Sequence, residues 1–265
     1  MTGDARASLI RKGTLASVLL LIVFLAGWQW GPGLLGVPSF IVPPLSMVAR
    51  EFVHAWRFDN LFYHTGVTVA EVLAGFVLGS LLGAFVGYLL GMSRVAEFAL
   101  SPYILALQIA PKVAFAPLFI LWMGFTVYPK ILVAILIVFF PVLVNVLTAI
   151  RGVDPDLINL ARAFKATRGQ IFWKIEFPTS MPSLFAGLRI GSTLAVVGVV
   201  VGELVGGNEG LGYLLTLGEG QGDTPMVFVS IVMLTLVGAI AYLGVILAER
   251  RVLHYLPARS VGTDL

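Results

Sequence analysis

Residues 72–93 read VLAGFVLGSLLGAFVGYLLGMS, and no charged side chain occurs in this stretch. The hydrocarbon core of a lipid bilayer is about 30 Å thick, so a helix needs about 20 apolar residues to cross it. The strands of a transmembrane barrel would instead alternate apolar and polar residues. Because the stretch is long enough and apolar on all sides, it predicts a membrane-spanning helix.

The same stretch carries five glycines at a spacing of four residues, which predicts close packing against another helix. Small residues at every fourth position let the backbones of two membrane helices approach each other. Glycine is common in membrane helices, but that alone does not place five of them in register. The sequence leaves open whether the partner helix belongs to the same chain. The glycines are Gly75, Gly79, Gly83, Gly87 and Gly91.

The composition extends the membrane prediction to the whole chain. Of the 265 residues, 58% are hydrophobic and 12% are charged, whereas charged residues make up about 25% of an average soluble domain. A soluble protein of this length would lack the charges to cover its surface, so soluble, nucleic-acid-binding and disordered proteins are excluded. The chain has no cysteine, which excludes disulfides, thiolate metal sites and catalytic thiols.

The charge-poor stretches predict an all-α membrane protein with about six transmembrane helices. The third of them is unusual, because Pro111 disfavours a helical conformation at the residue before it. We therefore expect residues 97–110 to form a helix near the cytoplasmic interface and a short span to follow. The expected spans are residues 14–30, 70–92, 113–128, 129–149, 183–206 and 225–248.

The distribution of lysine and arginine predicts that both termini are cytoplasmic. Basic residues are enriched in the cytoplasmic loops of membrane proteins. Here they concentrate at both termini, after the second span, and between the fourth and fifth spans. The last loop of the opposite face, residues 206–225, has none. The basic residues of the predicted cytoplasmic face include Arg6, Arg94, Arg162, Arg250 and Arg259.

The loop between the fourth and fifth spans, residues 151–182, reads RGVDPDLINLARAFKATRGQIFWKIEFPTSMP. Asp154 and Pro155 are typical of a helix start, and Thr167 and Gln170 have the spacing of a capping box. These signals predict two short amphipathic helices, the second ending at Pro178. An ordinary cytoplasmic loop needs no apolar helix face, so the apolar stripe predicts a docking site for another protein.

This loop resembles the EAA motif of permease subunits in bacterial ATP-binding-cassette importers. That motif has an alanine-rich start, a glycine, and an I-x-L-P end. Lys165 stands where the motif usually has glycine, and Phe177 where it usually has leucine, so the turn between the two helices departs from the pattern. The matching residues are Ala161, Ala163 and Ala166, followed by IEFP at residues 175–178.

Four further stretches extend the resemblance over residues 65–250. They are similar to the nitrate/sulfonate/taurine-type branch of binding-protein-dependent inner-membrane transport components. The resemblance implies a single transmembrane permease domain over residues 1–265, with its core at residues 65–250 and the fold of a type I importer permease. The stretches are APKVAFAPLFILWMGF (110–125), FFPVLVN (139–145), FAGLRIG (185–191) and VGELVGGNEGLGYLL (201–215).

In such importers the loop forms a coupling helix that fits a cleft of a separate ATPase subunit. This chain has no G-x-x-x-x-G-K-[ST] phosphate loop, so we expect no enzyme activity and no cofactor in it, with ATP and Mg bound by the ATPase. The resemblance also implies a homodimer of permease chains, an extracytoplasmic solute-binding protein, and the inner membrane of a bacterium. The residues expected to contact the ATPase are Leu160, Ala161, Ala163, Phe164, Lys165, Ala166, Arg168 and Pro178.

Four polar residues are candidates for the translocation pathway or its gate. Lys112 adjoins the helix break at Pro111, where it either draws anions through the pathway or anchors a helix end among the lipid headgroups. Arg189, near the cytoplasmic end of the fifth span, either lines the pathway or extends to the interface. Glu203, near the outer end of that span, has a structural or gating role or contacts the substrate. Asn208 lies in the glycine-rich turn that follows.

The predicted function is that of the membrane-spanning permease subunit of an ATP-driven importer for a small anionic or vitamin-precursor-like solute. The alternative is a self-sufficient secondary transporter or channel. Ion-coupled transporters usually show inverted repeats or acidic residues near the membrane midplane, and the sequence shows neither. A membrane enzyme is disfavoured because no catalytic cluster is visible. No metal site is expected, because no pair among His54, His64 and His254 has metal-ligand spacing.

Overall fold

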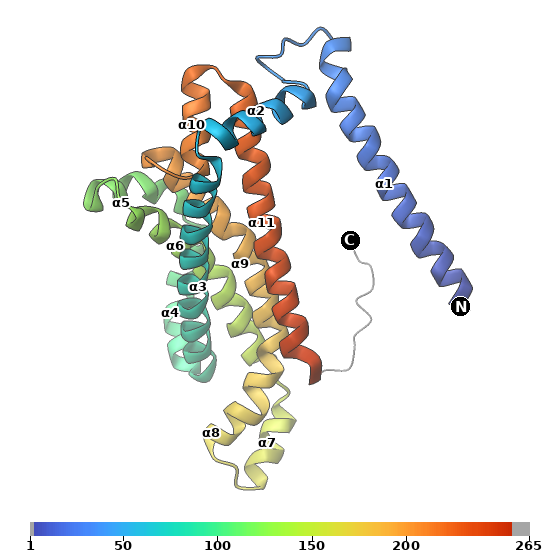
Figure 1. The fold of residues 1–265 in the computed structure, drawn as a ribbon. Helices are drawn as coiled ribbons and strands as arrows, with labels where there is room; N and C mark the ends of the chain where they lie inside the picture. Colours follow the sequence, from blue (N-terminus) through green and yellow to red (C-terminus); the bar gives the residue numbers. More distant parts are fainter. Residues whose placement is uncertain (1–2, 256–265) are drawn as a thin grey trace. The chain divides into compact units, whose positions relative to one another are not determined.

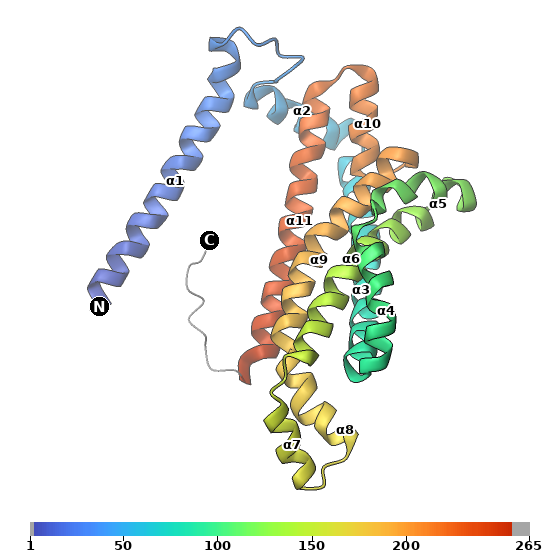
Figure 2. The ribbon, with the colours of Figure 1, turned by 180° about the vertical axis from the view of Figure 1, so that it is seen from behind.

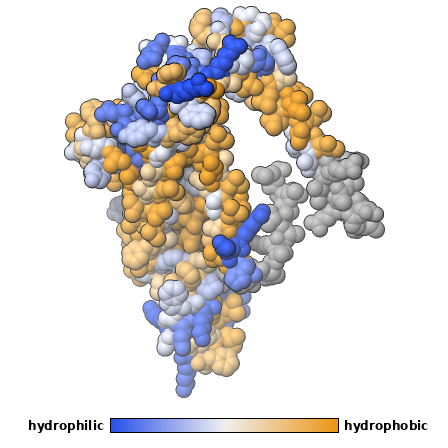
Figure 3. Space-filling model, in the orientation of Figure 1, coloured by the Kyte–Doolittle hydropathy of each residue, from blue (hydrophilic) through white to orange (hydrophobic). Residues whose placement is uncertain are grey.

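The computed structural model describes residues 3–255, and every regular element within them is a helix. Five of these helices are long and apolar enough to cross a membrane, and a sixth span results if one bent helix pair is counted as a single span. The predicted all-α fold with about six spans is therefore confirmed. Arg259, part of the predicted basic C-terminal tail, lies outside the described residues. Hydrophobic side chains dominate the surface of the long helices (Figure 3).

The chain divides into two compact units, each formed by two segments. Residues 1–62 and 214–232 form the first unit, and residues 63–213 and 233–265 form the second. The first unit contains α1 (Gly3–Leu34), α2 (Leu45–Phe58), most of α10 (Leu211–Gln221) and the start of α11 (Thr224–Val252).

Side-chain hydrogen bonds fix the connection between α1 and α2 in the first unit. The indole Nε1 of Trp28 donates to the carbonyl oxygen of Pro43 at 3.0 Å. The backbone N–H of Ser46 donates to Oε1 of Gln29 at 2.8 Å. These bonds satisfy backbone groups at the start of α2, where Pro44 offers no side-chain cap.

The second unit is a bundle in which α6 (Val127–Arg151) packs against both α3 (Leu61–Met92) and α9 (Phe177–Gly206), and α3 also contacts α9 (Figures 1 and 2). The five glycines of α3 face α6 in chain order. A Cβ at Gly75 would overlap the Cβ of Ala134, and a Cβ at Gly91 would lie 2.7 Å from Cγ2 of Ile150. The partner of the glycine stripe is thus α6 of the same chain.

A second glycine stripe, on α9, also contacts α6. A Cβ at Gly198 would lie 2.6 Å from the Cα of Ala134, and one at Gly202 would lie 2.8 Å from the Cα of Lys130. Both distances are far below ordinary contact, so the backbones approach each other only because the side chains are absent. Helix α6 therefore carries much of the buried core of this unit, including Val138, Val142 and Val146.

The region predicted as the third span is broken into two helices. Helix α4 (Arg94–Ile109) and the segment Lys112–Met123 meet at an angle of 81°. Pro111, which lacks an N–H, stands at the break. Helix α5 (Ala116–Met123) has eight residues, about 12 Å at 1.5 Å per residue, and cannot cross the bilayer alone. The structure thus has no single helix over residues 113–128, where one span was predicted.

The predicted short helices of the 151–182 loop are present as α7 (Pro155–Ala163) and α8 (Arg168–Ile171), which protrude from one end of the bundle (Figure 1). Both caps are confirmed, because Asp154 accepts from the N–H of Asp156 and Thr167 forms a capping box with Gln170. The predicted end at Pro178 is wrong. A π-helical turn, Phe172–Glu176, leads from α8 into α9, and Pro178 sits in the first turn of α9, where its missing N–H is tolerated.

Candidate functional site

A cluster of buried charged side chains lies at the end of the second unit opposite α7 and α8. Glu71 of α3, Lys130 of α6 and Glu203 of α9 have relative exposures of 2%, 6% and 1%. The Nζ of Lys130 lies 2.7 Å from Oε1 of Glu71. Charged side chains are rarely buried unless they are paired, so this contact explains how both tolerate the bundle interior.

Glu203 uses both carboxylate oxygens to hold the start of α10. Its Oε1 accepts a hydrogen bond from the hydroxyl of Thr68 at 2.7 Å, and its Oε2 accepts from the N–H of Gly212 at 2.6 Å. The same hydroxyl accepts from the N–H of Leu211 at 2.8 Å. The donors at a helix N-terminus lack partners within the helix, so Glu203 and Thr68 together cap α10.

The glycine-rich turn before α10 closes around the same carboxylate. Gly210 has φ +108°, which L side chains rarely adopt, and a Cβ there would overlap the Glu203 carboxylate. Its N–H donates to Nδ1 of His64 at 3.1 Å. Nζ of Lys130 lies 3.5 Å from the carbonyl oxygen of Glu209. Glu203, Lys130 and their partners thus fix the position of residues 209–212 against α3, α6 and α9; we call this group the Glu203 cluster.

The Glu203 cluster contains more acidic than basic side chains. It holds the two carboxylates of Glu71 and Glu203 against one ammonium group, that of Lys130. Oε2 of Glu71 is buried and has no hydrogen-bond partner among the described residues. The buried acidic and basic side chains of the arrangement take part in hydrogen bonds between helices, so it forms a hydrogen-bonded clamp.

The sequence pointed to Glu203 but not to the pair of Glu71 and Lys130. The two residues are 59 positions apart, and no spacing rule connects residues on different helices at that separation. The available signal was an acidic residue in one apolar helix and a lysine at the start of another. Only the packing of α3 against α6 brings the two together.

The four predicted pathway residues do not form one site. Asn208 is exposed in the turn beside Glu203. Arg189 lies in the other half of α9, where its Nε is 3.3 Å from Oε2 of Glu249 in α11. Lys112 stands at the break between α4 and α5. Its Nζ donates to the carbonyl oxygen of Gln108 at 2.6 Å and lies 4.9 Å from the centroid of the Phe140 ring.

The α7–α8 protrusion, residues 154–176, presents apolar side chains to solvent. Leu160 is 56% exposed, Phe164 is 79% exposed and Trp173 is 65% exposed. Of the other predicted docking residues, Ala161, Ala166 and Pro178 are half-buried, and Ala163, Lys165 and Arg168 are exposed. Large apolar groups at the tip of a basic protrusion are typical of a protein-docking surface.

The turn between α7 and α8 shows how Lys165 replaces the usual glycine. The N–H of Ala166 donates to the carbonyl oxygen of Ala161 at 3.0 Å, and the N–H of Lys165 donates to that of Arg162 at 2.8 Å. This is the hydrogen-bond pattern of a Schellman motif, whose residue after the helix end adopts a left-handed conformation. Lys165 has φ 57° and thus takes the backbone conformation that glycine adopts most readily.

Comparison with known proteins gives a family match over most of the chain. Residues 75–254 match the family described as "Binding-protein-dependent transport system inner membrane component". The chain is 40% identical to the riboflavin transport system permease protein RibX of Chloroflexus aurantiacus, with 92% of this chain and 90% of the relative covered.

Two further relatives have related names. The putative aliphatic sulfonates transport permease protein SsuC of Bacillus subtilis is 34% identical, with 92% of this chain and 89% of the relative covered. The formylaminopyrimidine transport permease protein ThiX of Halalkalibacterium halodurans is 32% identical, with 86% and 90% covered.

The fold is similar to that of a solved importer. An inward-facing structure of the MetNI methionine ABC transporter matches with a TM-score of 0.59 at 23% identity, covering 74% of this chain and 95% of that chain.

Proposed function

This chain belongs to the family of binding-protein-dependent transport system inner membrane components and is the permease subunit of an ATP-binding-cassette importer, and from that premise we propose how it works. Two copies enclose the translocation pathway in the inner membrane of a bacterium. Each copy contacts a separate ATPase subunit, which binds ATP and Mg²⁺, and an extracytoplasmic solute-binding protein delivers the solute. A self-sufficient secondary transporter or channel, the alternative from the sequence, does not fit this family.

The α7–α8 protrusion is the surface that contacts the ATPase in this proposal. The observation that carries it is the exposure of Leu160 and Phe164 at the tip of the protrusion. Burying such side chains against a partner is favourable by about 25 cal/mol per Å² of apolar surface. Movements of the ATPase would reach the bundle directly, because α8 continues through the π-helical turn into α9.

The test of this proposal replaces an apolar docking residue by a charged one. Phe164→Asp should abolish co-purification of the ATPase and ATP-driven uptake, because an unpaired charge buried in a packed contact costs on the order of several kcal/mol. Phe164→Leu, the matched control, keeps the apolar contact and should retain both activities. Normal uptake by the Asp variant, with the ATPase still bound, would contradict the docking role.

The opposite face receives the solute in this proposal, with both termini and the protrusion on the cytoplasmic side. This orientation is supported by the concentration of lysine and arginine in the loops and termini of the protrusion side. The Glu203 cluster then lies near the outer end of the pathway. We infer that it acts as a clamp that keeps residues 209–212 in place while the helices move, rather than as a substrate contact, because its carboxylates are buried.

The transported solute is small and either anionic or similar to a vitamin precursor. This inference is supported by the relatives named as permeases for riboflavin, aliphatic sulfonates and formylaminopyrimidine. Lys112, at the break between α4 and α5, offers a cation to an anionic solute there. Its ammonium group is not part of an ion pair among the described residues.

Lys112→Gln should reduce the initial uptake rate several-fold, because it removes the positive charge from the pathway, whereas Lys112→Arg should retain the rate. The measurement is uptake by vesicles that contain the permease, the ATPase and the solute-binding protein. ATP hydrolysis measured in parallel separates a loss of coupling from a loss of solute attraction. An unchanged rate with unchanged salt dependence in the Gln variant would leave Lys112 only its anchoring role.

A further inference from the structure

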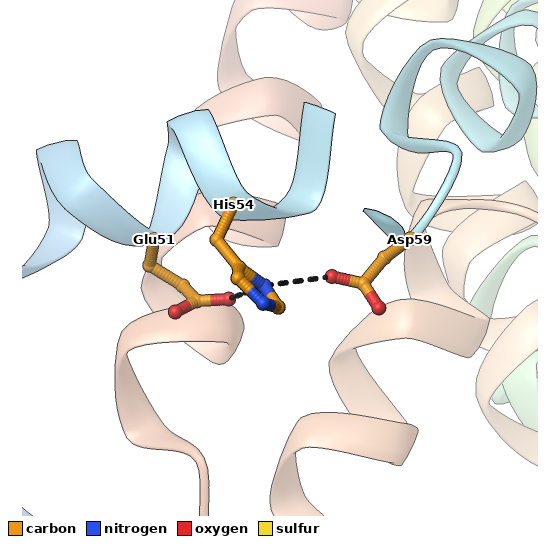
Figure 4. A group of neighbouring side chains, drawn as sticks. All are labelled: Glu51, His54 and Asp59. Carbon is orange, nitrogen blue, oxygen red and sulfur yellow. Dashed lines mark ion pairs between the residues drawn. The ribbon is translucent and has the colours of Figure 1, made fainter. Parts of the chain in front are cut away.

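Three side chains at the C-terminal end of α2 converge on one point (Figure 4). Glu51 and His54 are three residues apart, which places them on the same face of the helix. Asp59 caps the helix end, where its backbone N–H donates to the carbonyl oxygen of Ala55 at 3.1 Å. Nδ1 of His54 lies 3.5 Å from Oε1 of Glu51 and 3.3 Å from Oδ2 of Asp59.

These separations are compatible with a metal ion shared by the three side chains. Nitrogen–oxygen hydrogen bonds have lengths of about 2.7–3.2 Å, and both contacts are longer than that. Zinc binds histidine nitrogen and carboxylate oxygen at about 2.0–2.2 Å in a tetrahedron, whose ligand atoms are then roughly 3.3–3.6 Å apart. The two nitrogen–oxygen distances fall in that range, and the three ligand atoms all lie within 4.8 Å of one another.

The charges around the three residues also favour a cation. Two carboxylates, those of Glu51 and Asp59, lie beside one imidazole, that of His54. No lysine or arginine pairs with these carboxylates in the part of the chain that the structure describes.

The ligand geometry is supported by the surrounding chain. The ring of His54 lies 4.9 Å from the ring of Phe58, measured between centroids, which restricts the orientation of the imidazole. Glu51 is on a rigid helix, and Asp59 is held by its backbone hydrogen bond to that helix. A metal-binding histidine needs such orientation by its neighbours.

We propose that Glu51, His54 and Asp59 bind a divalent transition-metal ion, zinc above all, through Nδ1 of His54 and one oxygen of each carboxylate. A fourth position stays open to solvent, because the side chain of His54 is 56% exposed. The nitrogen ligand and the small ligand number select against Ca²⁺ and Mg²⁺, which prefer six or more oxygen ligands. The bound ion would tie the last turn of α2 to the chain that leaves it.

The test is a titration of the purified full-length chain, freed of any affinity tag, with Zn²⁺ at pH 7 in detergent. We expect one ion per chain, and we expect Glu51→Gln, His54→Gln and Asp59→Asn each to weaken binding at least tenfold. His254→Gln, an exposed histidine outside the cluster, is the matched control and should leave binding unchanged. Co²⁺ provides a second readout, because four-coordinate Co²⁺ absorbs strongly in the visible range and the ligand variants should lose that band.

Two results would overturn the proposal. The first is a wild-type chain that binds Zn²⁺ no more tightly than His54→Gln, which would leave only a protonated histidine between two carboxylates. The second is binding that persists in all three ligand variants, which would place the ion elsewhere. An unchanged elution volume on gel filtration checks that each variant is folded, and Glu51→Gln and Asp59→Asn provide independent tests if His54→Gln fails this check.

Discussion

At the scale of single residues, Lys165 determines the turn between α7 and α8, and Glu203 holds the start of α10. Lys165 adopts a left-handed conformation that costs an L residue roughly 1–2 kcal/mol. The two hydrogen bonds of the Schellman motif offset this cost, so the turn between α7 and α8 keeps its geometry without glycine. Glu203, at the opposite end of the second unit, is nearly inaccessible to solvent and accepts a hydrogen bond from a backbone N–H at the start of α10. Hydrogen bonds thus offset the cost of a left-handed backbone at Lys165 and the cost of burying the carboxyl group of Glu203.

Replacing one member of the buried Lys130–Glu71 pair should lower the free energy of unfolding much more than replacing both. Lys130→Met leaves the Glu71 carboxylate buried and unpaired, and we expect it to lower the free energy of unfolding by about 3–5 kcal/mol. Replacing both members, with Glu71→Leu and Lys130→Met together, removes both charges and should recover most of that loss. Thermal unfolding of the purified variants in detergent measures both effects.

The surface pair of Arg189 and Glu249 is the control for this prediction. Its side chains are 38% and 20% exposed, so Arg189→Met should cost less than about 1 kcal/mol, as for other partly exposed ion pairs. A double variant of Glu71 and Lys130 that is less stable than Lys130→Met alone would contradict the account of the Glu203 cluster as a compensated buried group.

At the scale of elements, α6 is the helix on which the second unit is built. Glycine stripes of α3 and α9 both contact it, and its residues Val138, Val142 and Val146 are buried. Association of helices in a membrane depends on such close packing, because lipid chains are as apolar as the helices themselves. Each glycine of the two stripes is therefore a point where an added methyl group would push the backbones apart.

Gly83→Ala should destabilise the bundle by about 1–3 kcal/mol, the usual range for overpacking a well-packed contact. Its new Cβ would lie 2.5 Å from the carbonyl oxygen of Phe139 and 3.1 Å from Cβ of Val142. Leu82→Ala changes the adjacent side chain, which is 49% exposed, and serves as the control. The melting temperatures of the two purified variants are compared, and equal melting temperatures would show that the stripe does not determine packing.

Local signals in the sequence predicted the helices, whereas the contacts between distant helices could not be predicted from it. The caps at Asp154 and Thr167 depend on residues within three positions, so the pattern was sufficient to locate α7 and α8. The prediction that a helix ends at Pro178 was wrong, because proline is found both after the end of a helix and in the first turn of one. The contact of Glu71 with Lys130, like the identity of α6 as the partner of the glycines, depends on helix packing that no short motif encodes.

At the scale of the whole molecule, the chain carries its recognisable features at opposite ends of the second unit. The α7–α8 protrusion lies at one end, and the Glu203 cluster with its glycine-rich turn lies at the other (Figure 1). Helix α9 runs between them, from Phe177 to Gly206. A displacement at the protrusion can thus reach the opposite end through one continuous helix, which is the connection that a permease driven by a separate ATPase requires.

Docking of the ATPase at the α7–α8 protrusion can be tested by cross-linking from single introduced cysteines, because the chain has none of its own. Phe164→Cys and Asn208→Cys place one thiol on the protrusion and one on the exposed turn at the opposite end. Each thiol is labelled with a benzophenone maleimide in membranes that contain the permease alone, the ATPase is then added, and the assembled importer is illuminated. We expect a covalent product with the ATPase from position 164 and none from position 208. An ATPase product from position 208, with none from position 164, would contradict both the docking surface and the orientation of the chain.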